Sequence, residues 1–272
     1  DGKNYMVLLG IRNEIERGSN MGRETFLVPV DWEREPFEWK ETKHLWPVVA
    51  AETGRVERIN EVVFSGSVQN IETSFEDKFE SDNLDLKWNF RRYPIEKIFY
   101  LDKQQNRLNL ICHHNQIKER VSAALLGFKQ TESNFEYSTQ MFFEPLNNGS
   151  EAGVSIFQKD DNYINFTLIR NDDKIVLQSY AVKNTEIEEF LSEPIKEYNG
   201  QIEFRIVANE DSYKLYYKTS RKDFELFTIL NGDLVISKGY TGAHLGLYAT
   251  GNGKNTKDFA SFDYVNYFTK KK

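Results

Sequence analysis

Acidic residues are the first candidates for chemistry, because two carboxylates that face one cleft can cleave a glycosidic bond. On a β-strand such a pair needs alternate positions, since successive side chains point to opposite faces. Glu76 and Asp77 are sequence neighbours and would face opposite sides. An alternating pattern of the form E-x-D-x-E would place its acids on one face of a strand. The string from Glu186 to Glu189 (E-I-E-E) lacks the central aspartate of that pattern, and it lies in 185–191, which we predict to form a turn or two of helix. These acids therefore predict no active site in the strand-rich region that contains them.

Acids at the two ends of a strand-rich region are candidate ligands of a structural calcium ion, which prefers oxygen donors. Glu76 and Asp77 lie in the first predicted strand of that region, and Asp258 and Asp263 lie around its last. Solvated surface acids are the alternative interpretation. We expect that no other cofactor is required.

The histidines and the cysteine give weaker indications of chemistry. His113 and His114 are expected to extend a strand, and adjacent strand residues would not readily share a metal ion. His244 has apolar neighbours and is expected to make a buried or interface hydrogen bond. Cys112 is the only cysteine, which excludes an internal disulfide, and its place in a predicted strand indicates a buried, unreactive thiol.

Length and charge narrow the possible classes. The chain has 272 residues, enough for one large all-β domain or two smaller ones. Its net charge of −7 argues against a nucleic-acid or anionic-membrane surface. No apolar run approaches the length of a membrane span, and no signal peptide is evident. Because the chain opens with Asp1 and Gly2, we expect it to be cut from something longer.

From Phe75 onward, short strand patterns alternate with turn clusters, which predicts a two-sheet β-sandwich. Strands are expected near 75–79, 88–90, 98–101, 107–112, 125–130, 135–143, 152–159, 163–170, 174–180, 201–208, 212–219, 224–230, 244–250 and 260–268. Six tyrosines on these strands could stack on sugars, but we expect them to be packing residues: Tyr163, Tyr180, Tyr213, Tyr216, Tyr217 and Tyr248.

The clearest strand pattern lies within Tyr240 to Gly253. Leu245, Leu247 and their alternate neighbours form one apolar face, and glycines on the other face would let a bulky group approach the backbone. The turn residues 251–253 and the strand that follows them predict a hairpin that closes the sandwich.

The amino-terminal region reads differently. Residues 5–11 and 23–32 are predicted strands, and Pro29 predicts an edge position or a bulge for the second, because proline donates no ladder hydrogen bond. Residues 33–48 are predicted to form a loop-rich stretch, and residues 51–73 are predicted to form a linker. Two strands are marginal alone, so this region needs a partner surface.

Several segments together resemble glycoside hydrolase family 43, in particular its β-xylosidase and α-L-arabinofuranosidase branch. The matching segments are Gly22 to Trp32 (GRETFLVPVDW), Trp46 to Val48 (WPV), Leu84 to Pro94 (LDLKWNFRRYP), Glu151 to Gln158 (EAGVSIFQ), Asp161 to Tyr163 (DNY) and Gly242 to Gly253 (GAHLGLYATGNG). The resemblance implies an all-β chain: the last strands of a five-bladed β-propeller in 1–50, a linker in 51–73, and a concanavalin-A-like (jelly-roll) β-sandwich in 74–272.

The resemblance also implies an inverting exo-glycosidase whose catalytic acids lie in propeller blades upstream of this chain. The chain alone should then be inert, and the complete propeller would bind a xylo- or arabino-oligosaccharide. The family places an arginine near the first motif, which makes Arg23 a candidate to contact sugar or the catalytic carboxylates, with pairing to Glu24 as the alternative. Arg12 is a second, weaker candidate of the same kind.

Two further expectations complete this interpretation. The alternative function is a free-standing carbohydrate-binding module, which would have no reason to carry propeller strands. Without the remaining blades, the amino-terminal strands would expose edges and apolar faces, so we expect them to pack on the sandwich, to pair with another chain in a self-association, or to be poorly ordered. A bacterial periplasmic or extracellular location is implied by the family alone.

Overall fold

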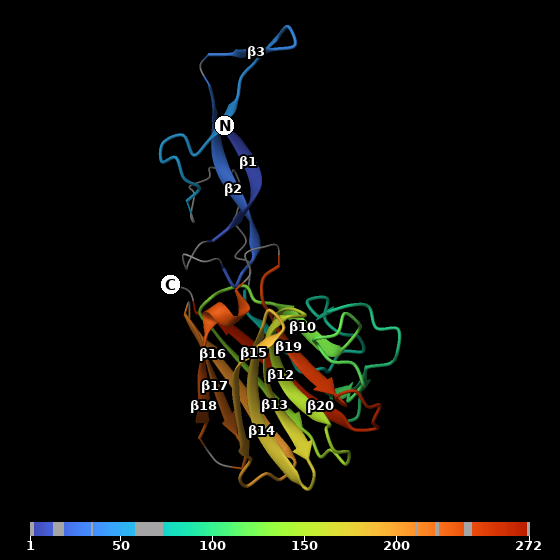
Figure 1. The fold of residues 1–272 in the computed structure, drawn as a ribbon. Helices are drawn as coiled ribbons and strands as arrows, with labels where there is room; N and C mark the ends of the chain where they lie inside the picture. Colours follow the sequence, from blue (N-terminus) through green and yellow to red (C-terminus); the bar gives the residue numbers. More distant parts are fainter. Residues whose placement is uncertain are drawn as a thin grey trace.

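The computed structural model describes residues 3–12, 19–33, 35–57, 73–209, 211–220, 223–236 and 241–270. Within these ranges the chain forms strands and one short 3₁₀ helix, η1 (Gly232–Val235), so the predicted all-β class is confirmed. Figure 1 shows a narrow amino-terminal part, in blue, standing at one end of a large two-layered body. No helix in the described ranges has the length and apolarity that crossing a membrane requires.

The amino-terminal part is an antiparallel sheet of three strands in the order β1 (Asn4–Ile11), β2 (Arg23–Trp32) and β5 (Pro47–Val49). A small hairpin, β3 (Phe37–Trp39) and β4 (Thr42–His44), extends from it, although the sequence predicted only loop there. The predicted edge position of β2 is wrong, since β2 is the middle strand. Pro29 is tolerated because pairing with β5 begins one residue later, at Val30.

The body is the predicted sandwich of two antiparallel sheets. The seven-stranded sheet runs β15-β14-β13-β12-β19-β10-β7, and the other runs β18-β17-β16-β11-β20-β9-β8 with β6 also paired to β20. The strands are β6 (Phe75–Asp77), β7 (Asn89–Phe90), β8 (Phe99–Asp102), β9 (Arg107–Ile111), β10 (Ala124–Lys129), β11 (Phe135–Phe142), β12 (Glu151–Lys159), β13 (Asn162–Asn171), β14 (Lys174–Lys183), β15 (Glu186–Pro194), β16 (Gln201–Ala208), β17 (Ser212–Lys218), β18 (Glu225–Asn231), β19 (His244–Thr250) and β20 (Phe259–Thr269).

The main core lies between the two sheets. Leu245 and Leu247 of β19 point into it, as the sequence pattern predicted. The rings of Phe166 and Phe204 meet there edge to face, with their centroids 4.9 Å apart. On the opposite face of β19, a Cβ on Gly246 would lie 2.8 Å from the side chain of Leu125, so the missing side chain admits that leucine. The glycine indeed allows a close approach.

The predicted closing hairpin is wrong. β19 lies in the seven-stranded sheet, whereas β20 lies in the other sheet between β11 and β9. The turn at 251–253 therefore carries the chain from one layer to the other. Alternation shows that both segments are strands, but it carries no information about which sheet each one joins.

The predicted helical turn at 185–191 is also wrong. These residues belong to β15, which pairs antiparallel with β14 at the edge of the seven-stranded sheet. Backbone hydrogen bonds offered by β14 outweigh the weak helical preference of a glutamate-rich segment. The other predicted strands agree with the structure within two residues at each end, except that β14 continues three residues further, to Lys183. Tyr240 and most of the predicted linker, 58–72, lie outside the described residues.

Candidate functional site at the junction of the two parts

The segment Ser19 to Gly22 joins the amino-terminal sheet to the sandwich. Ser19, Asn20 and Met21 are almost fully buried although they lie outside both hydrophobic cores. Gly22 forms an isolated antiparallel bridge with Thr241, just before β19. The backbone N–H of Ala243 donates to the carbonyl oxygen of Asn20 at 2.7 Å. The two parts are therefore connected by backbone hydrogen bonds as well as by the chain.

A pair of glycines allows the two backbones to approach so closely. Gly22 has a φ of +65°, a left-handed conformation that favours glycine. A Cβ on Gly22 would lie 2.3 Å from the backbone nitrogen of Gly242, and a Cβ on Gly242 would lie 2.3 Å from the carbonyl oxygen of Met21. Any side chain at either position would force the two parts of the chain away from each other.

A buried chain of polar groups extends from this contact into the sandwich. The Asn20 amide donates to the Tyr213 hydroxyl at 2.7 Å, which donates to Gln130 Oε1 at 3.1 Å. The Gln130 side chain in turn donates to the backbone oxygen of Glu132 at 3.0 Å. Burial raises the pKa of Tyr213, so the hydroxyl keeps its proton as the donor of this chain.

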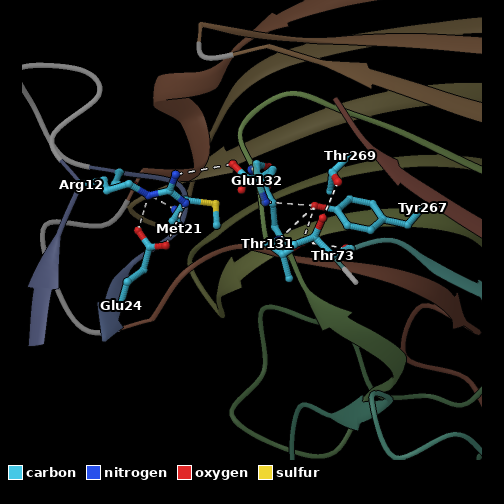
Figure 2. A network of polar contacts seen from close by, with 10 residues as sticks. Arg12, Met21, Glu24, Thr73, Thr131, Glu132, Tyr267 and Thr269 are labelled. Carbon is cyan, nitrogen blue, oxygen red and sulfur yellow. Dashed lines mark hydrogen bonds and ion pairs between the residues drawn. The ribbon is translucent and has the colours of Figure 1, made fainter. Parts of the chain in front are cut away.

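Arg12, just after β1, binds both parts of the protein. Its guanidinium donates to both carboxylate oxygens of Glu24, at 2.6 and 2.8 Å, and to Glu132 Oε2 at 3.5 Å (Figure 2). Glu24 lies on β2, whereas Glu132 lies in the connection between β10 and β11. Arg12 is mostly buried and is held by protein carboxylates, so in this structure it joins the two parts of the chain.

The same network continues behind Glu132. The Tyr267 hydroxyl accepts hydrogen bonds from the backbone N–H groups of Thr131 and Glu132, at 3.0 and 3.2 Å (Figure 2). The Thr131 hydroxyl donates to the backbone oxygen of Thr73 at 3.0 Å. The connection that receives Arg12 is thus fixed to the last strand of the sandwich and to the residues that precede its first strand.

Arg23 lies at the start of β2, opposite Ile11 of β1, and is exposed. The ammonium group of Lys129 donates to its backbone oxygen at 3.4 Å. Glu24, the alternative partner predicted for Arg23, is bound by Arg12. The two predicted arginines therefore take different positions, with Arg12 inside the junction and Arg23 at its surface.

A pocket of about 290 Å³ adjoins the junction, with Thr241 and His244 on one side and Arg91 on the other. Burial lowers the pKa of His244, whose Nδ1 lies 3.2 Å from the carbonyl oxygen of Gly242. Arg91 and Arg92 both donate to the carboxylate of Asp160, at 2.9 to 3.2 Å. Two guanidiniums share one carboxylate, so this rim carries an excess of positive charge.

The four predicted calcium ligands do not come together as one group. Asp77 accepts hydrogen bonds from the Phe79 backbone and the Trp88 indole, and Glu76 pairs with Lys78. Asp258 accepts from Ser150 Oγ at 2.6 Å and from two backbone N–H groups. Asp263 pairs with Arg107 at 3.1 Å. Each carboxylate has its own protein partners, and nothing in this geometry favours a shared calcium ion.

The expectation that His113 and His114 point apart is wrong. β9 ends at Ile111, and the two rings lie side by side with centroids 4.1 Å apart. With Glu96 they form the only group of three or more histidine, cysteine or acidic residues in the described ranges whose ligand atoms lie within 4.8 Å of one another. Cys112 is buried, as predicted, and burial raises the pKa of its thiol far above the usual range.

A second hollow, of about 580 Å³, lies on the outer face of the seven-stranded sheet. Its wall contains Glu151, which accepts hydrogen bonds from Thr167 and Tyr180 at 2.8 and 2.9 Å. Burial, followed by the charge of Glu151, raises the pKa of Tyr163 to about 12. Tyr163 and Tyr248 are therefore buried packing residues, and Tyr180 is hydrogen-bonded to Glu151, so the three do not form an open stacking platform.

The junction residues Asn20, Gly22, Gln130, Tyr213 and Gly242 were not predicted as functional. Asn20 and Tyr213 are 193 positions apart, and neither has a local motif that reveals its partner. The motifs around Gly22 and Gly242 were recognised as family segments, but the contact between them was not foreseen.

Comparison with known proteins bears on these observations. The family model described as the β-xylosidase C-terminal concanavalin A-like domain (GH43_C2) matches residues 76–268. The non-reducing end α-L-arabinofuranosidase BoGH43B of Bacteroides ovatus is 26% identical over 98% of this chain and 49% of its own length. A xylosidase/arabinosidase of Butyrivibrio fibrisolvens is also 26% identical, over 97% of this chain and 50% of its own length. The chain thus spans about half the length of these curated relatives.

Solved structures show the same fold. The Bacteroides ovatus xyloglucan-locus GH43B superimposes with a TM-score of 0.86 at 24% identity, covering 99% of this chain and 52% of that one. The xylan β-1,4-xylosidase of Bacillus halodurans gives a TM-score of 0.78 at 19% identity, covering 98% and 51%. Because the family model matches most of its residues, the chain belongs to the family of β-xylosidase C-terminal concanavalin A-like domains and corresponds to the C-terminal part of glycoside hydrolase family 43 enzymes.

Proposed function

We propose that this chain is the C-terminal portion of an inverting, exo-acting glycosidase of the β-xylosidase or α-L-arabinofuranosidase type, which acts in the breakdown of plant polysaccharides. In this proposal the sandwich braces a catalytic propeller and helps to shape its pocket, while the catalytic acids lie upstream. The single observation that carries the proposal is the junction, where the Gly22–Gly242 contact fixes the three-stranded amino-terminal sheet to the sandwich.

The exposed apolar residues of that sheet support a surface that another part of a protein covers. Val7 and Leu9 of β1 are 67% and 63% exposed, and Trp32 and Trp46 are about half exposed. Apolar residues gathered on a narrow sheet are typical of a surface that another part of a protein covers. In the proposal, the upstream propeller blades cover this surface, and the junction then sets the angle between propeller and sandwich.

The junction also supports a role in shaping the pocket. Arg23 is exposed at the start of β2, beside the junction, and we propose that it contacts the sugar or the catalytic carboxylates of the complete enzyme. Arg12 is bound to Glu24 and Glu132, so we assign it the role of holding β1 and β2 against the sandwich. Arg12 then acts on the pocket through the placement of Arg23.

Hydrolysis of nitrophenyl β-xyloside and α-arabinofuranoside tests the proposal when this chain and a version extended upstream to the length of its curated relatives are assayed side by side. Activity of the longer protein alone is the expected result. Hydrolysis by the chain itself would place the catalytic acids in the sandwich and contradict the proposal. If neither protein cleaves either substrate and the chain binds glycans, the free-standing binding module becomes the better account.

A further inference from the structure

Three connections meet at one side of the sandwich around two adjacent histidines. Glu96 lies between β7 and β8, His113 and His114 follow β9, and Asn255 lies between β19 and β20. One ligand atom from each of Glu96, His113 and His114 lies within 4.8 Å of the others. Metal-binding side chains from separate connections are thus already close enough for a small movement to bring them onto one ion.

The histidine pair is held in place by its own backbone. The carbonyl oxygen of His113 accepts from the Gly251 N–H at 2.7 Å and from the Thr250 hydroxyl at 3.2 Å. The carbonyl oxygen of His114 accepts from the Gly253 N–H at 2.9 Å. The two rings therefore sit on an anchored segment, which lowers the entropy that a ligand would otherwise have to overcome.

The side-chain hydrogen bonds orient one ring for coordination. Nδ1 of His114 lies 2.7 Å from Oδ1 of Asn255, which also accepts the His114 backbone N–H at 3.3 Å. A carbonyl oxygen can only accept, so Nδ1 carries a proton, and in the neutral ring Nε2 is then the nitrogen with the free lone pair. A histidine whose second nitrogen donates to an oxygen is the arrangement that commonly supports a metal ligand.

The other two groups already contact each other. Nε2 of His113 lies 2.7 Å from Oε2 of Glu96. The Glu96 side chain is 62% exposed, whereas that of His113 is buried, so the carboxylate can move while the ring stays fixed. A metal ion would take the place of the proton between them. The ring would exchange its hydrogen bond to Glu96 for the bond to the metal, and because Nδ1 would then carry the proton, it would also give up the long contact from the Asn115 N–H at 3.5 Å.

We propose that Glu96, His113 and His114 bind one divalent transition-metal ion of the zinc class, with solvent completing the coordination. Two imidazoles and a carboxylate suit zinc, whose ligand distances are about 2.0–2.2 Å, whereas calcium and magnesium prefer oxygen donors throughout. The three ligand atoms already lie within 4.8 Å of one another, and the exposed Glu96 carboxylate is the group that can move to complete tetrahedral spacing around an ion.

Such an ion would link the connection between β7 and β8, which carries Glu96, to the segment after β9, which carries both histidines. Binding only the folded chain, it would raise the thermal midpoint as its concentration rises. For a domain of this size, zinc at about 100 times its dissociation constant should raise the midpoint by about 5–10 °C. Calcium and magnesium at the same concentration should leave it unchanged.

The test uses the 272-residue chain, first treated with chelator, in calorimetric zinc titrations and thermal unfolding with zinc, calcium or magnesium. Glu96→Gln removes the exposed carboxylate and keeps a hydrogen-bond acceptor, and His114→Ala removes the half-buried ring. His44→Ala, in the distant β4, is the matched histidine control. We expect one zinc per chain, binding at least 10-fold weaker in each of the first two variants, and unchanged binding in His44→Ala.

Several results would overturn the proposal. One is the absence of one-to-one zinc binding by the unaltered chain, and another is a zinc affinity of Glu96→Gln and His114→Ala equal to that of the unaltered chain. Loss of zinc binding in His44→Ala, or a calcium-induced rise of the thermal midpoint equal to that caused by zinc, would also contradict it. Midpoints of the variants measured in chelator show whether each one is folded before zinc is added. Glu96→Gln changes an exposed side chain, so it keeps the test decisive even if His114→Ala destabilises the fold.

Discussion

The amino-terminal sheet and the sandwich are both antiparallel β structures, yet they bury their apolar residues in different ways. Along β11 every second residue is buried against the facing sheet, whereas along β1 no residue is fully buried. The sandwich contains both of the layers that its core needs. Within the described residues the amino-terminal sheet forms one layer, and its junction end packs on the sandwich. The difference is the one expected if, as proposed, another part of a protein covers the amino-terminal sheet.

Substitutions of apolar residues in the two regions should separate them most strongly. Phe166 packs between Phe204 and Phe227, and Phe166→Ala should cost about 3–5 kcal/mol of unfolding free energy. Leu9→Ala, on an exposed face, should change it by about 0.5 kcal/mol or less. Guanidinium unfolding followed by circular dichroism measures both. Equal losses would mean that the amino-terminal sheet is as well buried as the sandwich core.

Two glycines with nearly the same φ test the close contact at the junction. Gly22 and Gly54 have φ values of +65° and +67°, so alanine at either position carries a similar conformational cost, about 1–2 kcal/mol. Only Gly22→Ala adds a steric clash, which should cost a further 1–3 kcal/mol or so. Hydrogen exchange should show faster exchange of the Ala243 N–H in Gly22→Ala only. Identical behaviour of the two variants would contradict the junction described here.

The ion pairs of the two regions should also differ. Arg12→Gln leaves Glu24 partly buried without its bidentate partner and should cost about 1–2 kcal/mol. The matched change Lys78→Gln breaks an exposed pair with Glu76 and should cost less than about 0.5 kcal/mol. Thermal unfolding at low and high salt measures both. A larger loss in Lys78→Gln would remove Arg12 as a link between the two parts.

The smallest expected effect is an acid-dependent one within the sandwich. Burial raises the pKa of Asp258, but hydrogen bonds from Ser150 and two backbone N–H groups outweigh it and hold the pKa below its usual value. The stabilisation is therefore present above the unfolded pKa, about 3.9, and is lost as pH falls through the folded value. Asp258→Asn should flatten this acid limb in thermal unfolding. Asp82→Asn, at an exposed side chain, should leave it unchanged.

Much of the fold could be predicted because alternation is a local signal. The strands from Phe135 to Phe142 and from Gln201 to Ala208 show it in the sequence itself. Features set by distant partners could not be predicted. β15 is a strand because β14 pairs with it, and β19 and β20 enter different sheets for reasons that alternation does not carry.

The candidate site was harder to predict from the sequence than the fold. Asn20 meets Tyr213 only after the chain has folded, and the Gly22–Gly242 contact joins segments more than two hundred residues apart. His113 and His114 were expected to point apart because the strand was expected to continue, whereas β9 ends before them. Arg23 keeps its proposed role, which the family resemblance provided and local patterning could not.

Three of the four tryptophans provide the most direct test of whether another part of a protein covers the amino-terminal sheet. Trp32 and Trp46 are 48% and 56% exposed, whereas Trp88 is 7% exposed inside the sandwich and serves as an internal control. Oxidative footprinting would compare this chain with a version extended upstream. We predict that Trp32 and Trp46 are labelled readily in the chain and protected in the longer protein, while Trp88 stays protected in both. Equal labelling of Trp32 and Trp46 in the two proteins would show that nothing upstream covers the sheet, which would contradict the account.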